Sequence, residues 1–213
     1  MVEKQKNNTA DDAATLPSAI DLFKPSWQAI NVNLITFLEL ILIPLLLTFI
    51  GYIVFPKNSV MLYLLSYGGT ILCAPALIVA QLKSVRGLKI DLLPAIQESL
   101  PYMARYLALL VMIVSLTVIG LVLFVVPGLF VVHRFFLAPY YLFDKNTSAI
   151  EAMRMSAQNA KRYSRSIWEM LAVYVVLAIL SIIIIGYILF YLYICAPAIR
   201  YIQIQKLLKS RSK

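Results

Sequence analysis

The chain of 213 residues is 62% hydrophobic and only 14% charged, and its formal net charge is +9. Soluble domains are close to half apolar, so this composition excludes a soluble globular protein and indicates an all-α integral membrane protein. The basic residues flank apolar stretches, which favours anionic phospholipid as the partner and makes nucleic acid an unexpected one.

The chain divides into two short tails and one membrane domain. Residues 1–19 are polar and predict a disordered cytoplasmic tail, residues 20–209 a single membrane domain, and residues 210–213 a basic tail. The nearly uncharged stretches 34–55 and 106–132 are long enough to cross a bilayer, which takes about 20 apolar residues. We expect a multi-pass protein of the cytoplasmic (inner) membrane with both termini cytoplasmic.

An internal repeat sets the expected architecture. Ala-Pro occurs at 74–75, 138–139 and 196–197, and each proline is followed within ten residues by a lysine, namely Lys83, Lys145 and Lys206. An amphipathic lead-in precedes each pair of apolar segments and begins at Ile20, Ile90 and Ile150. The pattern predicts three repeats of an amphipathic helix plus a helical hairpin, over about 20–83, 90–145 and 150–209.

The repeat predicts about six transmembrane helices. Pro127-Gly128 is expected to turn segment 104–126 back into 129–143, and by analogy Gly186 turns the last apolar region into two short spans. This topology places nearly all basic side chains inside and only Lys57 outside. Five spans, the alternative, would put the basic C-terminus outside, against the positive-inside rule.

The three prolines are candidate kink positions. A proline inside a helix removes its own N–H and leaves the carbonyl four residues earlier without a partner. The prolines are Pro75, Pro139 and Pro197, and the freed carbonyls belong to Ile71, Phe135 and Tyr193. These carbonyls either mark packing kinks or line a shared polar path.

Three polar residues inside apolar segments are candidate functional residues. Glu39 lies in the first predicted span and Arg134 in the fourth. They either pair with each other, or Arg134 contacts a lipid phosphate or a substrate. His133, beside Arg134, is expected to be a packing or interfacial residue.

Segment 148–166 predicts an interfacial amphipathic helix. Ser148 and Glu151 form a capping box at its start. Its apolar side is formed by Ile150, Met153, Ala157, Ala160 and Tyr163. Four basic residues away from most of that side are candidate lipid-headgroup contacts, namely Arg154, Lys161, Arg162 and Arg165.

Two long segments carry a resemblance to a known group. DLFKPSWQAINVNLITFLELILI (21–43) and VVPGLFVVHRFFLAPYYLFDKNTSAIEAMRMSAQNAKR (125–162) are similar to the membrane domain associated with bacterial glycerophosphodiester phosphodiesterases and to related stand-alone six-span membrane proteins of uncharacterised function. The resemblance covers about 20–209. The matching positions are Pro127, Gly128, Arg134, Pro139, Glu151 and Ser156. It implies architectural roles for them, because the activity of those enzymes resides in a separate soluble barrel domain.

We therefore expect a non-enzymatic membrane protein with no cofactor and no metal. Its expected role is membrane or envelope organisation, or interaction with anionic phospholipid. The alternative is a transporter or channel for a small solute or lipid, with proline-kinked spans lining a path. The sequence lacks the nucleophile–base pair or metal ligands of an intramembrane enzyme. Cys73 and Cys195, both within apolar segments, are expected to be packing residues.

Overall fold

The computed structural model describes residues 16–55, 59–180 and 193–211, and these residues form helices and no strand. In chain order the helices are η1 (Ile20–Leu22), α2 (Phe23–Val32), α3 (Leu34–Val54), α4 (Val60–Val85), α5 (Leu92–Ser99), η2 (Leu100–Tyr102), α6 (Met103–Leu123), α7 (Val125–Phe135), α8 (Ala138–Lys145), α9 (Ala149–Arg162), α10 (Ser164–Leu180) and α12 (Ala196–Arg211). The all-α class predicted from composition is confirmed.

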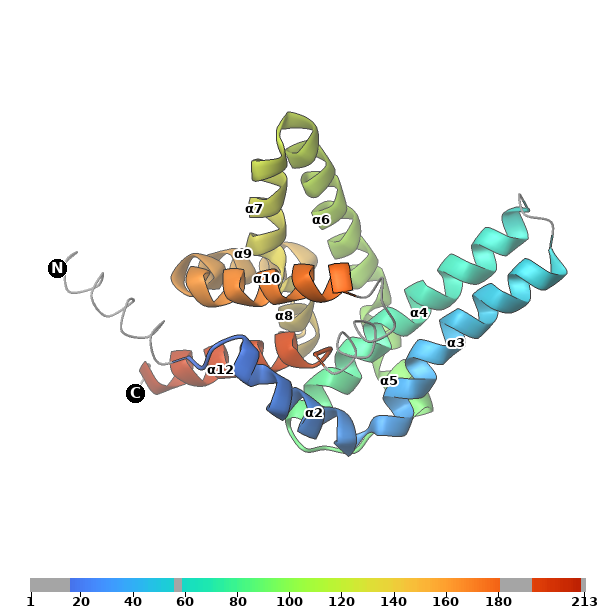
Figure 1. The fold of residues 1–213 in the computed structure, drawn as a ribbon, viewed down its shortest axis with the longest axis horizontal. Coiled ribbons are helices and arrows are strands. Elements are labelled where there is room, and N and C mark those ends of the chain that lie inside the picture. Colours follow the sequence, from blue (N-terminus) through green and yellow to red (C-terminus); the bar gives the residue numbers. More distant parts are fainter. Residues whose placement is uncertain (1–15, 56–58, 181–192, 212–213) are drawn as a thin grey trace.

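Two helical hairpins project from a common base (Figure 1). One pairs α3 with α4 and the other pairs α6 with α7. Helices α3 and α6 each have 21 residues, so each is about 30 Å long and matches the hydrocarbon thickness of a bilayer. The halves of the hairpins farthest from the base expose large apolar side chains, among them Phe49, Ile53, Val122 and Phe124. The hairpins therefore have the length and surface of membrane-spanning elements.

Four helices of the described chain are long and apolar enough to span a membrane, and a fifth span is counted if α9 and α10 form one broken span. The four are Leu34–Val54, Val60–Val85, Leu92–Leu123 and Val125–Lys145. The number is smaller than the six predicted. Helix α12 is not among the candidates, because polar and basic residues interrupt its sequence, and α10 turns by 101° from α9. The predicted turn at Gly186 lies outside the described residues.

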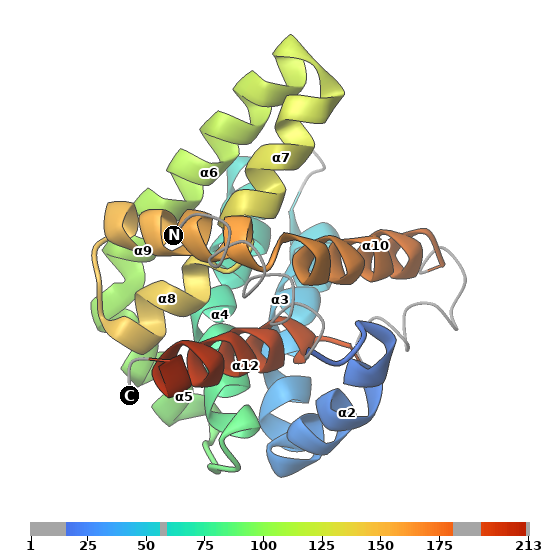
Figure 2. The same cartoon turned by 90° about the vertical axis from the view of Figure 1, so that its left-hand side faces the viewer.

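The base is built around the lower half of α4. Helices α8 and α12 pack against α4, α9 packs on α8, and α2 contacts both α4 and α12 (Figures 1 and 2). Fully buried side chains concentrate here, including Leu142, Met170 and Ile204. The segments that precede η1 and α12 meet in the base, since the hydroxyl of Tyr193 donates to the carbonyl of Ala19 at 2.8 Å.

A buried asparagine locks the first hairpin to the base. Asn33, between α2 and α3, donates from Nδ2 to Ser84 Oγ at 2.7 Å and to the Leu88 carbonyl at 2.8 Å. Its Oδ1 accepts the Ile90 N–H at 2.8 Å, and Thr36 donates to the Ile90 carbonyl at 2.8 Å. These bonds satisfy polar groups that would be costly to bury unpaired, and they fix the loop between α4 and α5.

The second hairpin turns at Phe124, three residues before the predicted turn. Phe124 has an extended backbone, with φ −167° and ψ 155°, and Pro127-Gly128 falls in the first turn of α7. A proline suits that turn, where its N–H would lack a helical partner anyway. Gly128 instead allows close packing: a Cβ on Gly120 would lie 2.9 Å from the Gly128 Cα. The two glycines thus set how closely α6 and α7 approach.

The three candidate kink prolines occupy two kinds of position. Pro75 lies inside α4, whereas Pro139 and Pro197 lie in the first turns of α8 and α12. The chain has broken and restarted at these two prolines, so they do not kink a continuous helix. The carbonyl of Tyr193, predicted to be free, accepts the Ala196 N–H at 3.0 Å and the Tyr174 hydroxyl at 3.1 Å.

The repeat itself stays a prediction. The first two predicted units each contain short lead-in helices followed by a hairpin, whereas the third contains α9, the crossing helix α10 and α12. Residues 1–15 of the predicted tail, Lys57 and residues 212–213 lie outside the described residues. Cys73 and Cys195 are buried and free, and burial raises the pKa of the Cys195 thiol to about 12. Cys195 is therefore a protonated packing residue at neutral pH.

Candidate functional site

The three helices that carry Ala-Pro converge in the base. Helix α4 contacts both α8 and α12, and Ala76, Ala138 and Ala196 are 0% exposed. Alanine lets helix backbones approach closely, so these small residues bring together three segments far apart in sequence. The C-terminal ends of α4 and α8 consequently lie beside α12.

Hydrogen-bonded side chains fill the centre of this convergence. Gln81 of α4 accepts the Tyr140 hydroxyl at 2.8 Å and donates to the Ile194 carbonyl at 3.1 Å. The ring of Tyr201 lies 6.0 Å from that of Tyr140 and 4.8 Å from that of Tyr141. The meeting point of the three helices is therefore packed and cross-linked by polar bonds.

The Asp144 carboxylate links the C-terminal ends of α4 and α8 to α12. It lies near the end of α8, forms an ion pair with Arg86 just after α4, and accepts the Tyr201 hydroxyl of α12 at 2.6 Å. Its side chain is mostly buried, whereas that of Arg86 is 45% exposed. Asn146 then ends α8 in a left-handed conformation, with φ 51°. One carboxylate thus holds α4, α8 and α12 in register.

A basic cleft opens beside Asp144, with a volume of about 340 Å³. Its lining comprises Arg86, Asp144, Lys145, Tyr201, Ile202, Gln205, Lys206, Leu208 and Lys209. Four basic residues therefore face a single carboxylate that is already bonded to Arg86 and Tyr201. Lys145 and Lys206 are exposed. The cleft has the charge and size to attract an anionic group.

A second hollow of about 210 Å³ adjoins this basic cleft and shares Arg86 and Asp144 with it. Its lining includes Lys83, which pairs with Glu98, together with the rings of Tyr102 and Phe143. The lysine that follows each Ala-Pro step thus lines one of two adjoining hollows. The sequence shows these three lysines at matching positions, but it does not place them in one site.

The length of α4 relates the basic cleft to a membrane surface. Lys83 follows the first residue of α4, Val60, by 23 positions, which is about 35 Å along a helix. The hydrocarbon core of a bilayer is about 30 Å thick. When α4 spans the hydrocarbon from Val60 onward, Lys83 and Arg86 therefore lie beyond it, among the lipid headgroups.

The Glu39–Arg134 ion pair, one of the two alternatives that the sequence left open, does not form in the part of the chain that the structure describes. Glu39 lies on α3 and Arg134 on α7, in different hairpins. Arg134 is exposed, and its backbone carbonyl accepts the Ser156 hydroxyl at 2.8 Å. The two charges lie in different hairpins and therefore have different neighbours.

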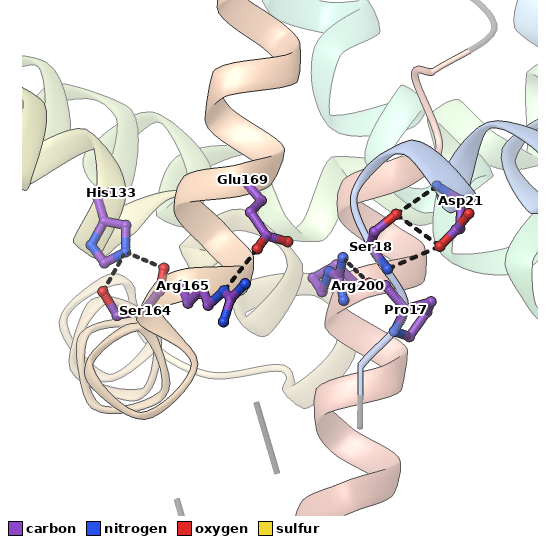
Figure 3. Close-up of polar contacts among 8 residues, drawn as sticks. All are labelled: Pro17, Ser18, Asp21, His133, Ser164, Arg165, Glu169 and Arg200. Carbon is purple, nitrogen blue, oxygen red and sulfur yellow. Dashed lines mark hydrogen bonds and ion pairs between the residues drawn. The ribbon is translucent and has the colours of Figure 1, made fainter. Parts of the chain in front are cut away.

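His133 packs against α10 (Figure 3). Its ring stacks on that of Trp168 with centroids 4.6 Å apart, and its Nε2 lies 3.3 Å from the carbonyl and 3.4 Å from the hydroxyl of Ser164. The side chain is buried. Each of these contacts is that of a packing residue, as expected.

Helix α9 packs into the base with most of the predicted apolar side, since Met153, Ala160 and Tyr163 are buried. Its N-cap is confirmed, because Ser148 Oγ accepts the Glu151 N–H at 3.3 Å, while the Glu151 carboxylate lies 3.8 Å from Arg154. Ile150 is exposed, and the buried positions are Ala149, Ala152, Met153, Ser156 and Ala160. Of the predicted headgroup contacts, Arg154, Lys161 and Arg165 are exposed and Arg162 is half-buried, and none of the four lines the basic cleft.

Arg200 was missed by sequence analysis and is 0% exposed. Its Nη2 donates to the Pro17 carbonyl at 3.0 Å, while Nε and Nη1 have no partner among the described residues (Figure 3). Burial lowers the pKa of the guanidinium, and nearby Tyr193 and Glu169 oppose this shift. An arginine still keeps its charge, so this buried cation ties α12 to the segment before η1.

The model of one family, Uncharacterised protein family (UPF0259), matches residues 54–209. The chain belongs to this family. No curated protein and no solved structure matches it.

The UPF0259 match covers roughly three quarters of the chain. It includes every residue of the basic cleft and leaves α2 and nearly all of α3 outside. An uncharacterised family is consistent with the stand-alone proteins that the sequence resembles. The match shows no link to the glycerophosphodiester phosphodiesterases.

Proposed function

We propose that this membrane protein is non-enzymatic and binds the headgroup of an anionic phospholipid in the cytoplasmic leaflet of the inner membrane. The observation that carries this proposal is the basic cleft at the ends of α4, α8 and α12. Arg86, Lys145, Lys206 and Lys209 surround it, and its one carboxylate is engaged within the protein. Phosphate is the anion of highest local concentration at that level of a membrane.

The packed centre supports lipid binding over transport. A transporter of the predicted kind would leave a polar path along the proline-containing helices, lined by their freed carbonyls. Instead, Gln81, Tyr140 and Tyr201 fill the meeting point of those helices, and the Tyr193 carbonyl is hydrogen-bonded. The role that follows is organisation of the membrane around a bound lipid.

Two of the exposed lysines of the basic cleft, Lys145 and Lys206, give its direct test. Each basic residue near an anionic surface contributes about 1 kcal/mol, so Lys145→Gln combined with Lys206→Gln is expected to weaken the preference for an anionic lipid roughly 30-fold. The measurement is native mass spectrometry in mixed micelles of phosphatidylglycerol and phosphatidylcholine, recording the ratio of the two lipids retained.

The matched control replaces two exposed lysines that do not line the cleft, Lys24→Gln with Lys89→Gln. This variant carries the same net charge as the test variant and should keep the wild-type ratio. An equal loss in both variants would show general attraction of a basic protein to anionic lipid and would contradict a defined site.

Arg134 is proposed as a second lipid contact. It lies ten positions after the hairpin turn at Phe124, about 15 Å along the helix, and an exposed arginine at that depth extends toward a phosphate. We expect Arg134→Leu to lower anionic-lipid retention about fivefold without lowering the unfolding temperature. A lower unfolding temperature would instead show that Arg134 stabilises the fold and would contradict a lipid contact.

A further inference from the structure

An apolar groove lies along the second hairpin, between α6 and the α7–α8 segment. Its volume is about 230 Å³. Leu109, Leu110, Ile113 and Val114 line it from α6, and Val132, Phe135, Phe136 and Pro139 line it from the opposite side, with Tyr106 at one end. Val114 lies ten positions before the hairpin turn at Phe124, which is about 15 Å along the helix. The groove therefore lies at hydrocarbon depth.

The apolar groove lies next to the smaller polar hollow, on the side away from the basic cleft. Tyr102 and Phe143 line the smaller polar hollow, and one helical turn farther along the same helices Tyr106 and Pro139 line the apolar groove. The ring of Phe143 lies 5.3 Å from that of Tyr102 and 5.9 Å from that of Tyr106. These three rings separate the polar hollow from the groove.

The lining of the three adjoining hollows therefore changes from charged at one end to apolar at the other. It begins at the basic cleft, passes the Arg86–Asp144 pair into the smaller hollow, crosses the aromatic rings and ends in an apolar groove inside the membrane. Tyrosines at the boundary fit this order, because their rings are apolar and their hydroxyls polar. A ligand that matches it has a charged head and an aliphatic chain.

We propose that the groove between α6 and α7–α8 holds one acyl chain of the phospholipid whose headgroup occupies the basic cleft. This inference rests on the proposed function and names the ligand as an intact lipid, not a free phosphate ester. Bulk lipid chains contact every exposed face of the hairpins. The groove differs from those faces because it leads to the polar hollows at its surface end, which fixes the direction and position of the chain.

The test fills the groove from a position where a larger side chain causes little strain. Val114 is half exposed and lines the groove, whereas Val111, on the same helix, is exposed and does not line it. The variants are Val114→Trp and the control Val111→Trp. Two probes are used with each: long-chain phosphatidylglycerol, by native mass spectrometry, and its water-soluble deacylated headgroup, glycerophosphoglycerol, by calorimetry.

The inference predicts that Val114→Trp lowers retention of phosphatidylglycerol about tenfold, the loss of roughly two methylene contacts. Binding of glycerophosphoglycerol should not change, and Val111→Trp should behave as wild type. Wild-type retention by Val114→Trp would overturn the acyl-chain site and leave the headgroup site standing. Equal losses in both variants would identify bulk lipid contacts and would also overturn it. A wild-type protein that does not prefer phosphatidylglycerol over phosphatidylcholine would refute the headgroup site and this inference together.

Discussion

Replacing Gly120 with Ala is expected to lower the free energy of unfolding by about 2 kcal/mol, as overpacking of a tight contact does. The new methyl group would lie 2.9 Å from both the Cα and the N of Gly128. Backbone atoms at that distance cannot rotate away as a side chain can, so α6 and α7 must separate. The measurement is reversible unfolding in mixed micelles, followed by the loss of helical circular dichroism.

Gly68 provides the matched control, since a Cβ there would meet nothing within 4 Å. Gly68→Ala replaces a helical glycine in open space and should stabilise the protein by up to about 1 kcal/mol. Gly69→Ala should fall between the two, because its closest contact is the mobile end of the Leu47 side chain, at 2.9 Å. If Gly120→Ala and Gly68→Ala were equally stable, the close approach of α6 and α7 would be contradicted.

The substitution Asp144→Asn is expected to change stability and lipid preference in opposite directions. It weakens a charge-assisted bond to the buried Tyr201 hydroxyl and removes the ion pair with Arg86. The free energy of unfolding should fall by about 2 kcal/mol. At the same time the basic cleft loses its only carboxylate, so its preference for anionic lipid should rise about fivefold.

The neighbouring Lys83–Glu98 pair provides a control for the effect of Asp144→Asn on stability and lipid preference. Both side chains are substantially exposed, so Glu98→Gln should cost less than about 1 kcal/mol. Glu98 lines the smaller hollow and not the basic cleft, so a change in lipid preference smaller than that of Asp144→Asn is expected. A fall in both stability and anionic preference for Asp144→Asn would show that Asp144 acts only as a structural anchor.

Local sequence signals predicted local structure well. Apolar length predicted the hairpins, and Ser148 predicted the start of α9. The turn expected at Pro127-Gly128 lies at Phe124, because proline is accommodated in the first turn of a helix and the extended Phe124 makes the break. Pro139 and Pro197 begin helices for the same reason, whereas they had been expected to kink them.

Lateral arrangement could not be predicted in the same way. The sequence places Glu39 and Arg134 in two predicted spans, but it does not say which spans are neighbours. The basic cleft escaped prediction because its residues come from α4, α8 and α12, about 60 positions apart. The lysine after each Ala-Pro step was the sequence feature that could have indicated the cleft. Only the convergence of the three helices shows that these lysines lie close together. Nothing in the local pattern distinguished Arg200, a buried anchor, from the surface arginines of α9.

The central claim is that the basic cleft selects an anionic phospholipid from the membrane. The most direct measurement is native mass spectrometry of the wild-type protein, extracted gently from its own membrane, with the retained lipids compared with the lipids of that membrane. Selection by the cleft should give at least severalfold enrichment of an anionic phospholipid in the retained fraction. Retained lipids in the same proportions as the membrane would contradict it.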